Sequence, residues 1–315
     1  MQTTFSSWMY RIDRLSQRFL PAAGILARTS VRLSELAREG DLDRPAPPSF
    51  CPDERVFFAQ LRADVLAHLA VNHPLLARLA CSPFVREDYR IFGLQYFVLV
   101  GSFPTYLEHL LLRAPSSDAK KWLATGLLAE YTTGPAEKDR VELYRQFLHA
   151  TGSPSGEELE TPLHDDVTGF IREHLRICRD EPFLVGLGAV GPGHAMGIPR
   201  MFAQILQGLR QARFRDEEIG YFLLDAEQDT SPGAWIEDAL ASQSDTPEAQ
   251  AQIYRGAMLS LAARTKLWSG VQDKMVRWRQ PGNVHLRAQA RLRGHLSAGE
   301  MTLGQWRVRA RELCR

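Results

Sequence analysis

The chain has 315 residues, of which 44% are hydrophobic and 24% are charged, and its formal net charge is +1. This composition is ordinary for a globular protein with a sizeable core, and the near-neutral balance gives no global field for nucleic acid or a membrane surface. The four cysteines form no CxxC pair, which excludes a thiolate zinc site and suits a reducing cytoplasm.

The two ends of the chain differ from its middle. Residues 1–51 are expected to form an N-terminal extension that ends in a proline-rich, extended stretch. Residues 281–315 are rich in arginine and are expected to form a basic C-terminal tail. The tail has few aromatic residues, so it favours a solvated helix or a homodimer contact over a nucleic-acid arm. The longest uncharged run, 91–107, falls short of a membrane span. We therefore expect a cytoplasmic protein.

Residues 52–280 show helical periodicity with few interruptions. The periodic segments, in chain order, are 54–69, 73–79, a long aromatic-rich segment from 82 to 106, 120–131, 141–148, 167–178, 183–209 and 249–276. No alternating strand pattern or hairpin turn stands out. The sequence predicts an all-α bundle of about seven or eight helices.

Asp225 and Asp229 are four residues apart in a segment that reads as helix, so their carboxylates would lie on one face. Two like charges on a largely apolar face repel one another and are costly to desolvate unless a cation lies between them. The alternative is that one acid is exposed and Asp229 only caps the next helical segment.

Glu130 ends an apolar helical segment, and His194 lies in a helix that is loosened by glycine and proline. Taken singly, each has an ordinary structural explanation, as a surface acid and a core histidine. Taken together with Asp225 and Asp229, they fall on three helices of one bundle, an arrangement typical of carboxylate and histidine metal sites. Oxygen donors with one imidazole suit iron or manganese better than zinc or copper.

The order and spacing of several segments resemble the heme-oxygenase-like, iron-containing redox enzymes, the diiron oxidases related to the PqqC and TenA proteins. The resemblance covers about residues 55–280. The segments that carry it are 73–79, 89–97, 103–107, 127–130, 141–152, 186–189 and 220–229. It implies a heme-oxygenase-like fold, an iron cofactor and a small-molecule substrate.

The resemblance also implies a ligand pattern from which this chain departs. Glu130 and Asp229 match an expected glutamate and aspartate, and His194 falls close to a second expected glutamate. Asp225 takes the place of a histidine. Two further histidines are missing, since the chain has Arg140 or Val141 at one position and Pro232 at the other. Either the ligands have been exchanged, leaving Glu130, His194, Asp225 and Asp229 around a metal, or the site has been lost.

Three functions follow from the resemblance. The first is an iron-dependent oxidoreductase that uses dioxygen on a small, amino-acid-like substrate in a biosynthetic pathway. The second is a metal-free enzyme of the PqqC or TenA kind, in which the pocket positions a substrate for acid and base chemistry. The third is a non-catalytic binding or scaffold protein that has kept the fold without the metal.

Overall fold

A computed structural model describes residues 49–131, 139–226, 240–280, 282 and 288, and every regular element among them is helical. The all-α prediction is therefore confirmed. The elements, in chain order, are α3 (Glu54–Ala67), α4 (Pro74–Cys81), α5 (Arg86–Arg113), α6 (Ser117–Tyr131), α7 (Arg140–Ala150), α8 (Glu157–Glu160), α9 (Asp165–Asp180), α10 (Phe183–Val190), η2 (Gly191–Ala195), α11 (Ile198–Gln211), η3 (Asp216–Glu218), α12 (Gly220–Ala226) and α14 (Pro247–Trp278).

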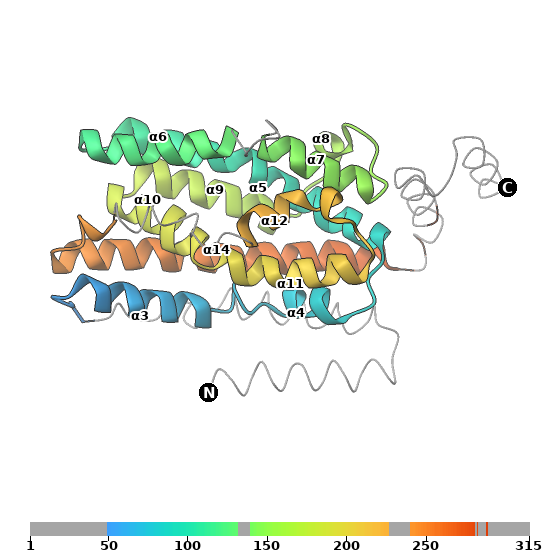
Figure 1. The fold of residues 1–315 in the computed structure, drawn as a ribbon, viewed down its shortest axis with the longest axis horizontal. Coiled ribbons are helices and arrows are strands. Elements are labelled where there is room, and N and C mark those ends of the chain that lie inside the picture. The colour runs from blue at the N-terminus through green and yellow to red at the C-terminus, as the bar shows by residue number, and fades with distance from the viewer. Residues whose placement is uncertain (1–48, 132–138, 227–239, 281, 283–287, 289–315) are drawn as a thin grey trace.

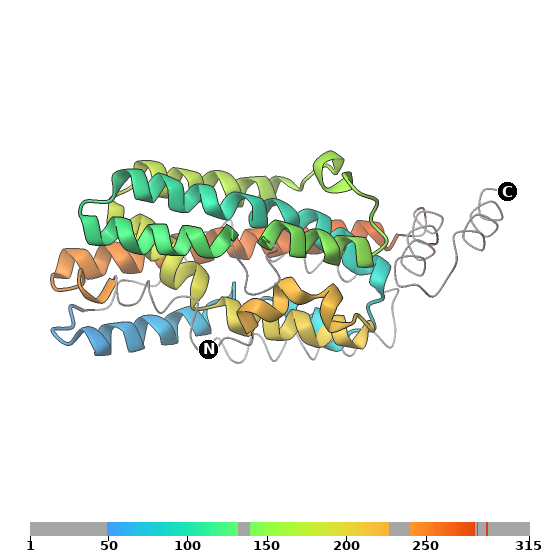
Figure 2. The same ribbon diagram turned by 45° about the horizontal axis from the view of Figure 1, so that its top comes forward.

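The long helix α14 runs through the middle of the bundle, between an upper group that includes α5, α6 and α9 and a lower group that includes α3, α4 and α11 (Figures 1 and 2). It packs against α9, α10, α5 and η2. Gly256 of α14 and Gly188 of α10 allow the backbones of these two helices to approach closely, because neither residue has a Cβ atom. A Cβ atom at Gly256 would lie 2.0 Å from the Val185 carbonyl oxygen, and one at Gly188 would lie 2.1 Å from that of Ile253. The glycine-rich segment therefore serves helix packing.

The predicted helix over 183–209 is divided into α10, η2 and α11. The five-residue π-helical turn η2 contains Pro192, whose missing N–H cannot continue an α-helical ladder. Such turns are often found at functional sites. This division is one reason why the described residues form more separate helices than the seven or eight expected.

The aromatic stripe predicted on the long helix lies in the core of the bundle. Phe92 and Tyr96 of α5 stack nearly parallel to Trp268 of α14, with ring centroids 6.4 and 5.6 Å apart. All three side chains are buried. Aromatic pairs at these distances add to the stability that burial already provides, so these rings hold α5 and α14 against one another.

The predicted extension over 1–51 and the predicted tail over 281–315 lie almost entirely outside the described residues. Cys51 is described, and its backbone N–H and C=O both hydrogen-bond to the Gln250 side chain of α14, at 3.0 and 2.8 Å. Among the described helices, none combines the length and the apolar character that crossing a membrane requires.

Candidate functional site

Arg264 lies in the interior of the bundle, with a side chain that is 0% exposed. Nη2 donates a hydrogen bond to Nδ1 of His194, 2.7 Å away. Within the described part of the chain, Nε and Nη1 make no hydrogen bond. A buried guanidinium without a carboxylate partner is uncommon, because removing its charge from water costs several kcal/mol. Within the described residues, Arg264 is thus a buried cation with two donor atoms, Nε and Nη1, that make no hydrogen bond.

Aromatic side chains surround this guanidinium. Its carbon atom lies 5.1 Å from the ring centroid of Phe170, a cation–π distance. Burial is the largest effect and lowers the pKa of Arg264, whereas a side-chain hydrogen bond with Tyr96 and the electrostatic effect of the Tyr96, Tyr106 and Tyr221 hydroxyls favour its charged form. Arginine keeps its proton even so, because its ordinary pKa lies far above neutral pH. The surroundings are therefore apolar rings with a few phenol oxygens.

His194 is held in one tautomer by Arg264. A guanidinium can only donate hydrogen bonds, so Nδ1 accepts and the proton of the neutral ring lies on Nε2. Burial first, and then the charge of Arg264, lower the pKa of His194 well below its ordinary value. The ring stacks on Phe103 with centroids 4.4 Å apart. His194 is thus a neutral donor at Nε2 near pH 7.

Glu130 forms an ion pair with Arg140, with Oε1 and Nε 3.3 Å apart and each side chain only 12–13% exposed. Arg140 begins α7 and is close enough for its charge to lower the pKa of His194 further. Arg140 therefore connects the two residues, since it pairs with Glu130 and its charge acts on His194. Each has an arginine as its neighbour.

The other two predicted ligands cannot be placed. Asp229, Pro232 and the side chain of Asp225 lie outside the described residues. The set of Glu130, His194, Asp225 and Asp229 around one metal stays a prediction. Within the described residues, no group of three or more histidine, cysteine, aspartate or glutamate side chains has the arrangement of a metal site.

A second histidine, His174, is close enough to Arg264 for its charge to act on the imidazole. His174 of α9 contacts the carbonyl oxygen of Phe170 through Nδ1 at 3.0 Å and the Ser260 hydroxyl through Nε2 at 2.9 Å. Burial and then the charge of Arg264 lower its pKa to about 3. With both ring nitrogens engaged, His174 supports the packing of α9 on α14.

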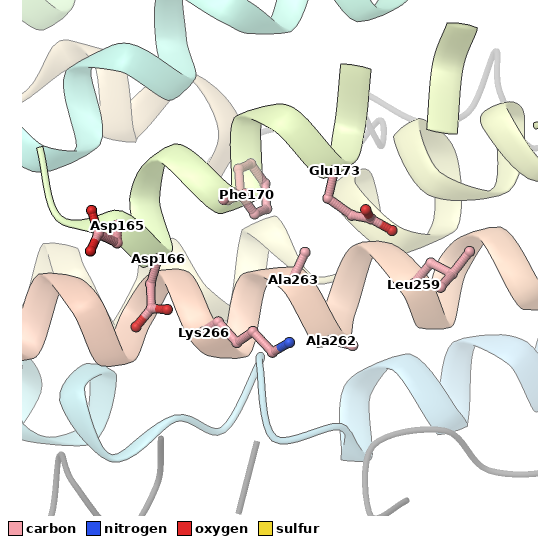
Figure 3. A pocket seen from close by; sticks show the side chains of 9 residues that line it. Asp165, Asp166, Phe170, Glu173, Leu259, Ala262, Ala263 and Lys266 are labelled. Atoms are coloured by element: carbon pink, nitrogen blue, oxygen red, sulfur yellow. The ribbon is translucent and has the colours of Figure 1, made fainter. Parts of the chain in front are cut away.

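A surface groove of about 370 Å³ runs between α9 and α14. Figure 3 shows Asp165, Asp166 and Glu173 on its α9 side and Lys266 on its α14 side. Phe170 also lines this groove, so one aromatic ring separates it from the buried guanidinium. With three carboxylates and one ammonium, the groove carries a net negative charge, whereas the region around Arg264 is positively charged.

Sequence reasoning missed Arg264, Trp268 and Gln272, which follow one another at intervals of four along α14. All three side chains are 0% exposed and have polar atoms that make no hydrogen bond within the described residues. One signal was available, since Arg264 interrupts an otherwise apolar stretch of a predicted core helix.

The profile of a family described as "Iron-containing redox enzyme" matches residues 90–265, more than half of the chain. A protein of Chlamydia muridarum named 4-aminobenzoate synthase is 24% identical over 176 residues, which cover 55% of this chain and 72% of that protein. Another of the same name, from Nitrosomonas europaea, is 22% identical over 230 residues, 69% of this chain and 91% of the relative.

Solved structures show the same fold at low identity. A CADD-like protein of unknown function from Nostoc punctiforme superposes with a TM-score of 0.60 at 14% identity, covering 71% of this chain and 98% of that one. A TenA homolog from Pseudomonas syringae superposes with a TM-score of 0.57 at 12% identity, covering 72% and 98%. The predicted relationship to TenA-type proteins is confirmed at the level of fold.

Proposed function

Because this chain belongs to the iron-containing redox enzyme family, we propose that it is an enzyme that binds a small aromatic carboxylate inside the helical bundle. In this proposal Arg264 binds the carboxylate group. The observation that carries it is the complete burial of Arg264 with Nε and Nη1 unused among the described residues. A carboxylate would supply both the missing negative charge and the missing acceptors.

The aromatic part of the ligand is favoured by what surrounds the guanidinium. Tyr96, Tyr106 and Phe170 offer flat apolar surface beside a fixed positive charge. A molecule with a ring next to its carboxylate would match both features. The curated relatives are named 4-aminobenzoate synthases, and an aminobenzoate is an aromatic carboxylate. This supports a biosynthetic role for the same chemical class here.

His194 and Glu130 would have supporting roles. The proton on Nε2 of His194 would be available for a hydrogen bond to the ligand, because Arg264 already engages Nδ1. Glu130 would keep Arg140 in place beside the site. Of the functions expected from the sequence, this corresponds most closely to a metal-free enzyme that positions its substrate.

The described residues do not fit iron as they stand. Nδ1 of His194 accepts from Arg264, its Nε2 carries the proton, and Glu130 is paired with Arg140. Two guanidinium groups in the same region would also repel a metal cation. An iron-dependent oxidoreductase that uses dioxygen is the second candidate, favoured by the family match. It would need Asp225, Asp229 and a Glu130 released from Arg140.

Calorimetric titration with benzoate and 4-aminobenzoate tests the proposal. Arg264→Met should weaken binding by about 10- to 100-fold, since a hydrogen bond to a charged group contributes about 1.5–3 kcal/mol. Arg277→Met is the matched control on the same helix, because the Arg277 side chain is 66% exposed. Equal affinity of the wild type and Arg264→Met, or no binding to either, would refute the proposal.

A further inference from the structure

Gln272 lies two helical turns beyond Arg264 on the same face of α14, with Trp268 between them. Its side chain is 0% exposed, and neither Nε2 nor Oε1 makes a hydrogen bond within the described residues. Nε1 of Trp268 is likewise unused. Residues spaced by four share one side of a helix, so these polar atoms follow one line through the interior.

Other buried glutamines of this protein show what a satisfied amide looks like. Gln95 donates to the Pro162 carbonyl oxygen at 3.1 Å and accepts from the backbone N–H of His164 at 2.8 Å. Gln250 donates to the carbonyl oxygens of Cys51 and Ser244. Buried polar side chains almost always have such partners. An amide with neither half used within the described residues is therefore an exception, and a bound molecule would satisfy it.

We propose that Gln272 determines substrate specificity by binding a polar group at the end of the ligand opposite its carboxylate. This rests on the proposed function, in which Arg264 holds the carboxylate. An amide both donates and accepts, so it suits an amino or hydroxyl substituent on the ring. The Cα atoms of Arg264 and Gln272 are about 12 Å apart along the helix, from the rise of 1.5 Å per residue. Two long side chains and one substituted ring can span that separation.

The side chains that lie between these two ends include three aromatic rings. Trp268 stacks with Tyr96 at 5.6 Å and with Phe92 at 6.4 Å, and all three rings are buried. The ligand class is thus a ring with a carboxylate on one side and a hydrogen-bonding substituent across from it. A ring with an apolar substituent would leave the Gln272 amide unsatisfied, and such a mismatch discriminates strongly.

The test measures the affinities of benzoate, 4-aminobenzoate and 4-methylbenzoate for the wild type, Gln272→Leu and Gln272→Met. The wild type should bind 4-aminobenzoate about 10-fold or more tightly than 4-methylbenzoate. The amino group would hydrogen-bond to the Gln272 amide, whereas the methyl group would leave that amide without a hydrogen bond. Both Gln272 variants should lose this preference, while their affinity for benzoate stays within about 3-fold of the wild type, since Arg264 is unchanged.

The melting temperature of the ligand-free protein is a second readout, with Gln95→Leu as the matched control. Gln95→Leu should melt several degrees below the wild type, because it removes satisfied hydrogen bonds and leaves their partners buried. Both Gln272 variants should melt at or above the wild type, because they remove an amide with no partner among the described residues.

Three results would overturn the inference. The first is a preference for 4-aminobenzoate that persists in both Gln272 variants. The second is a melting temperature lowered as far in them as in Gln95→Leu, which would mean that the free protein or its bound water already satisfies the amide. The third is failure of both variants to fold. If instead benzoates bind the wild type and Arg264→Met equally, the proposed function fails, and this inference fails with it.

Discussion

Nη2 of Arg264 lies 2.7 Å from Nδ1 of His194, which joins the long helix α14 to the π-helical turn η2, seventy residues earlier in the chain. This contact determines the tautomer of His194 and uses one of the donor atoms of Arg264. The imidazole is a neutral ring with its proton on Nε2, and Nε and Nη1 of the guanidinium make no hydrogen bond among the described residues. An acceptor-rich anion fits this pair better than a cation does.

Arg264→Met should leave the ligand-free protein at least as stable as the wild type. The substitution removes a fully buried charge that has no carboxylate partner among the described residues, and replacing buried charges with apolar groups is neutral or stabilising by about 1–4 kcal/mol. Urea unfolding gives the free energy directly. A loss of more than about 2 kcal/mol would mean that contacts within the protein already compensate the guanidinium.

Stability should fall as the pH is lowered from about 6.5 towards 3. Burial lowers the pKa of His73 to about 3, and His174 behaves similarly. The unfolded chain therefore binds protons in this range that the folded chain does not. Each such histidine lowers the free energy of unfolding by about 1.4 kcal/mol per pH unit as the pH falls.

His73→Asn isolates one of these histidines. His73 is the N-cap of α4, where its Nδ1 accepts from the backbone N–H of Leu75 at 3.1 Å. Asparagine is also a good N-cap but does not titrate. Between pH 6 and 4 the variant's stability should depend on pH less steeply, by about 1.4 kcal/mol per unit. Identical slopes for the variant and the wild type in urea unfolding at several pH values would contradict the prediction.

Wild-type protein loaded anaerobically with ferrous iron should retain little metal after desalting, whereas Arg140→His should retain more. The substitution frees Glu130 from its ion pair and adds an imidazole beside it. Arg145→His is the control on the same helix, since Arg145 is half exposed and paired with Glu158. Metal analysis giving one or more iron atoms per wild-type chain would favour the iron-dependent candidate instead.

Two glycines should respond in opposite ways to alanine. Gly256→Ala should destabilise the protein by about 1–3 kcal/mol, because the added Cβ would lie 2.0 Å from the Val185 carbonyl oxygen. Gly169→Ala, on α9, meets nothing within 4 Å and should stabilise the protein by up to about 1 kcal/mol through helix propensity. Thermal unfolding of both variants checks how closely α10 packs on α14.

Much of the fold follows from sequence because it depends on local periodicity. The apolar spacing over 249–276 predicts α14, and Pro74 after His73 predicts the start of α4. The turn η2 was expected only as a loosened helix, since Gly191 and Pro192 indicate where a ladder breaks but not which hydrogen bonds replace it.

The candidate site was harder to predict. Glu130 and His194 were selected as polar residues on apolar helices, and Arg140 lies close to both of them. Arg264 interrupts an apolar stretch of the sequence, but what sets Arg264 and Gln272 apart is that they have polar atoms without a hydrogen bond among the described residues. A polar atom without a partner is a property of the folded chain alone.

A crystal structure of the wild type soaked with 4-aminobenzoate tests the central claim most directly. We predict a carboxylate oxygen within about 2.7–3.2 Å of Nε or Nη1 of Arg264, the usual range for such hydrogen bonds. The amino group should lie towards Gln272. A metal ion bound to Glu130, or an aminobenzoate bound only outside the bundle with Arg264 unchanged, would contradict the account.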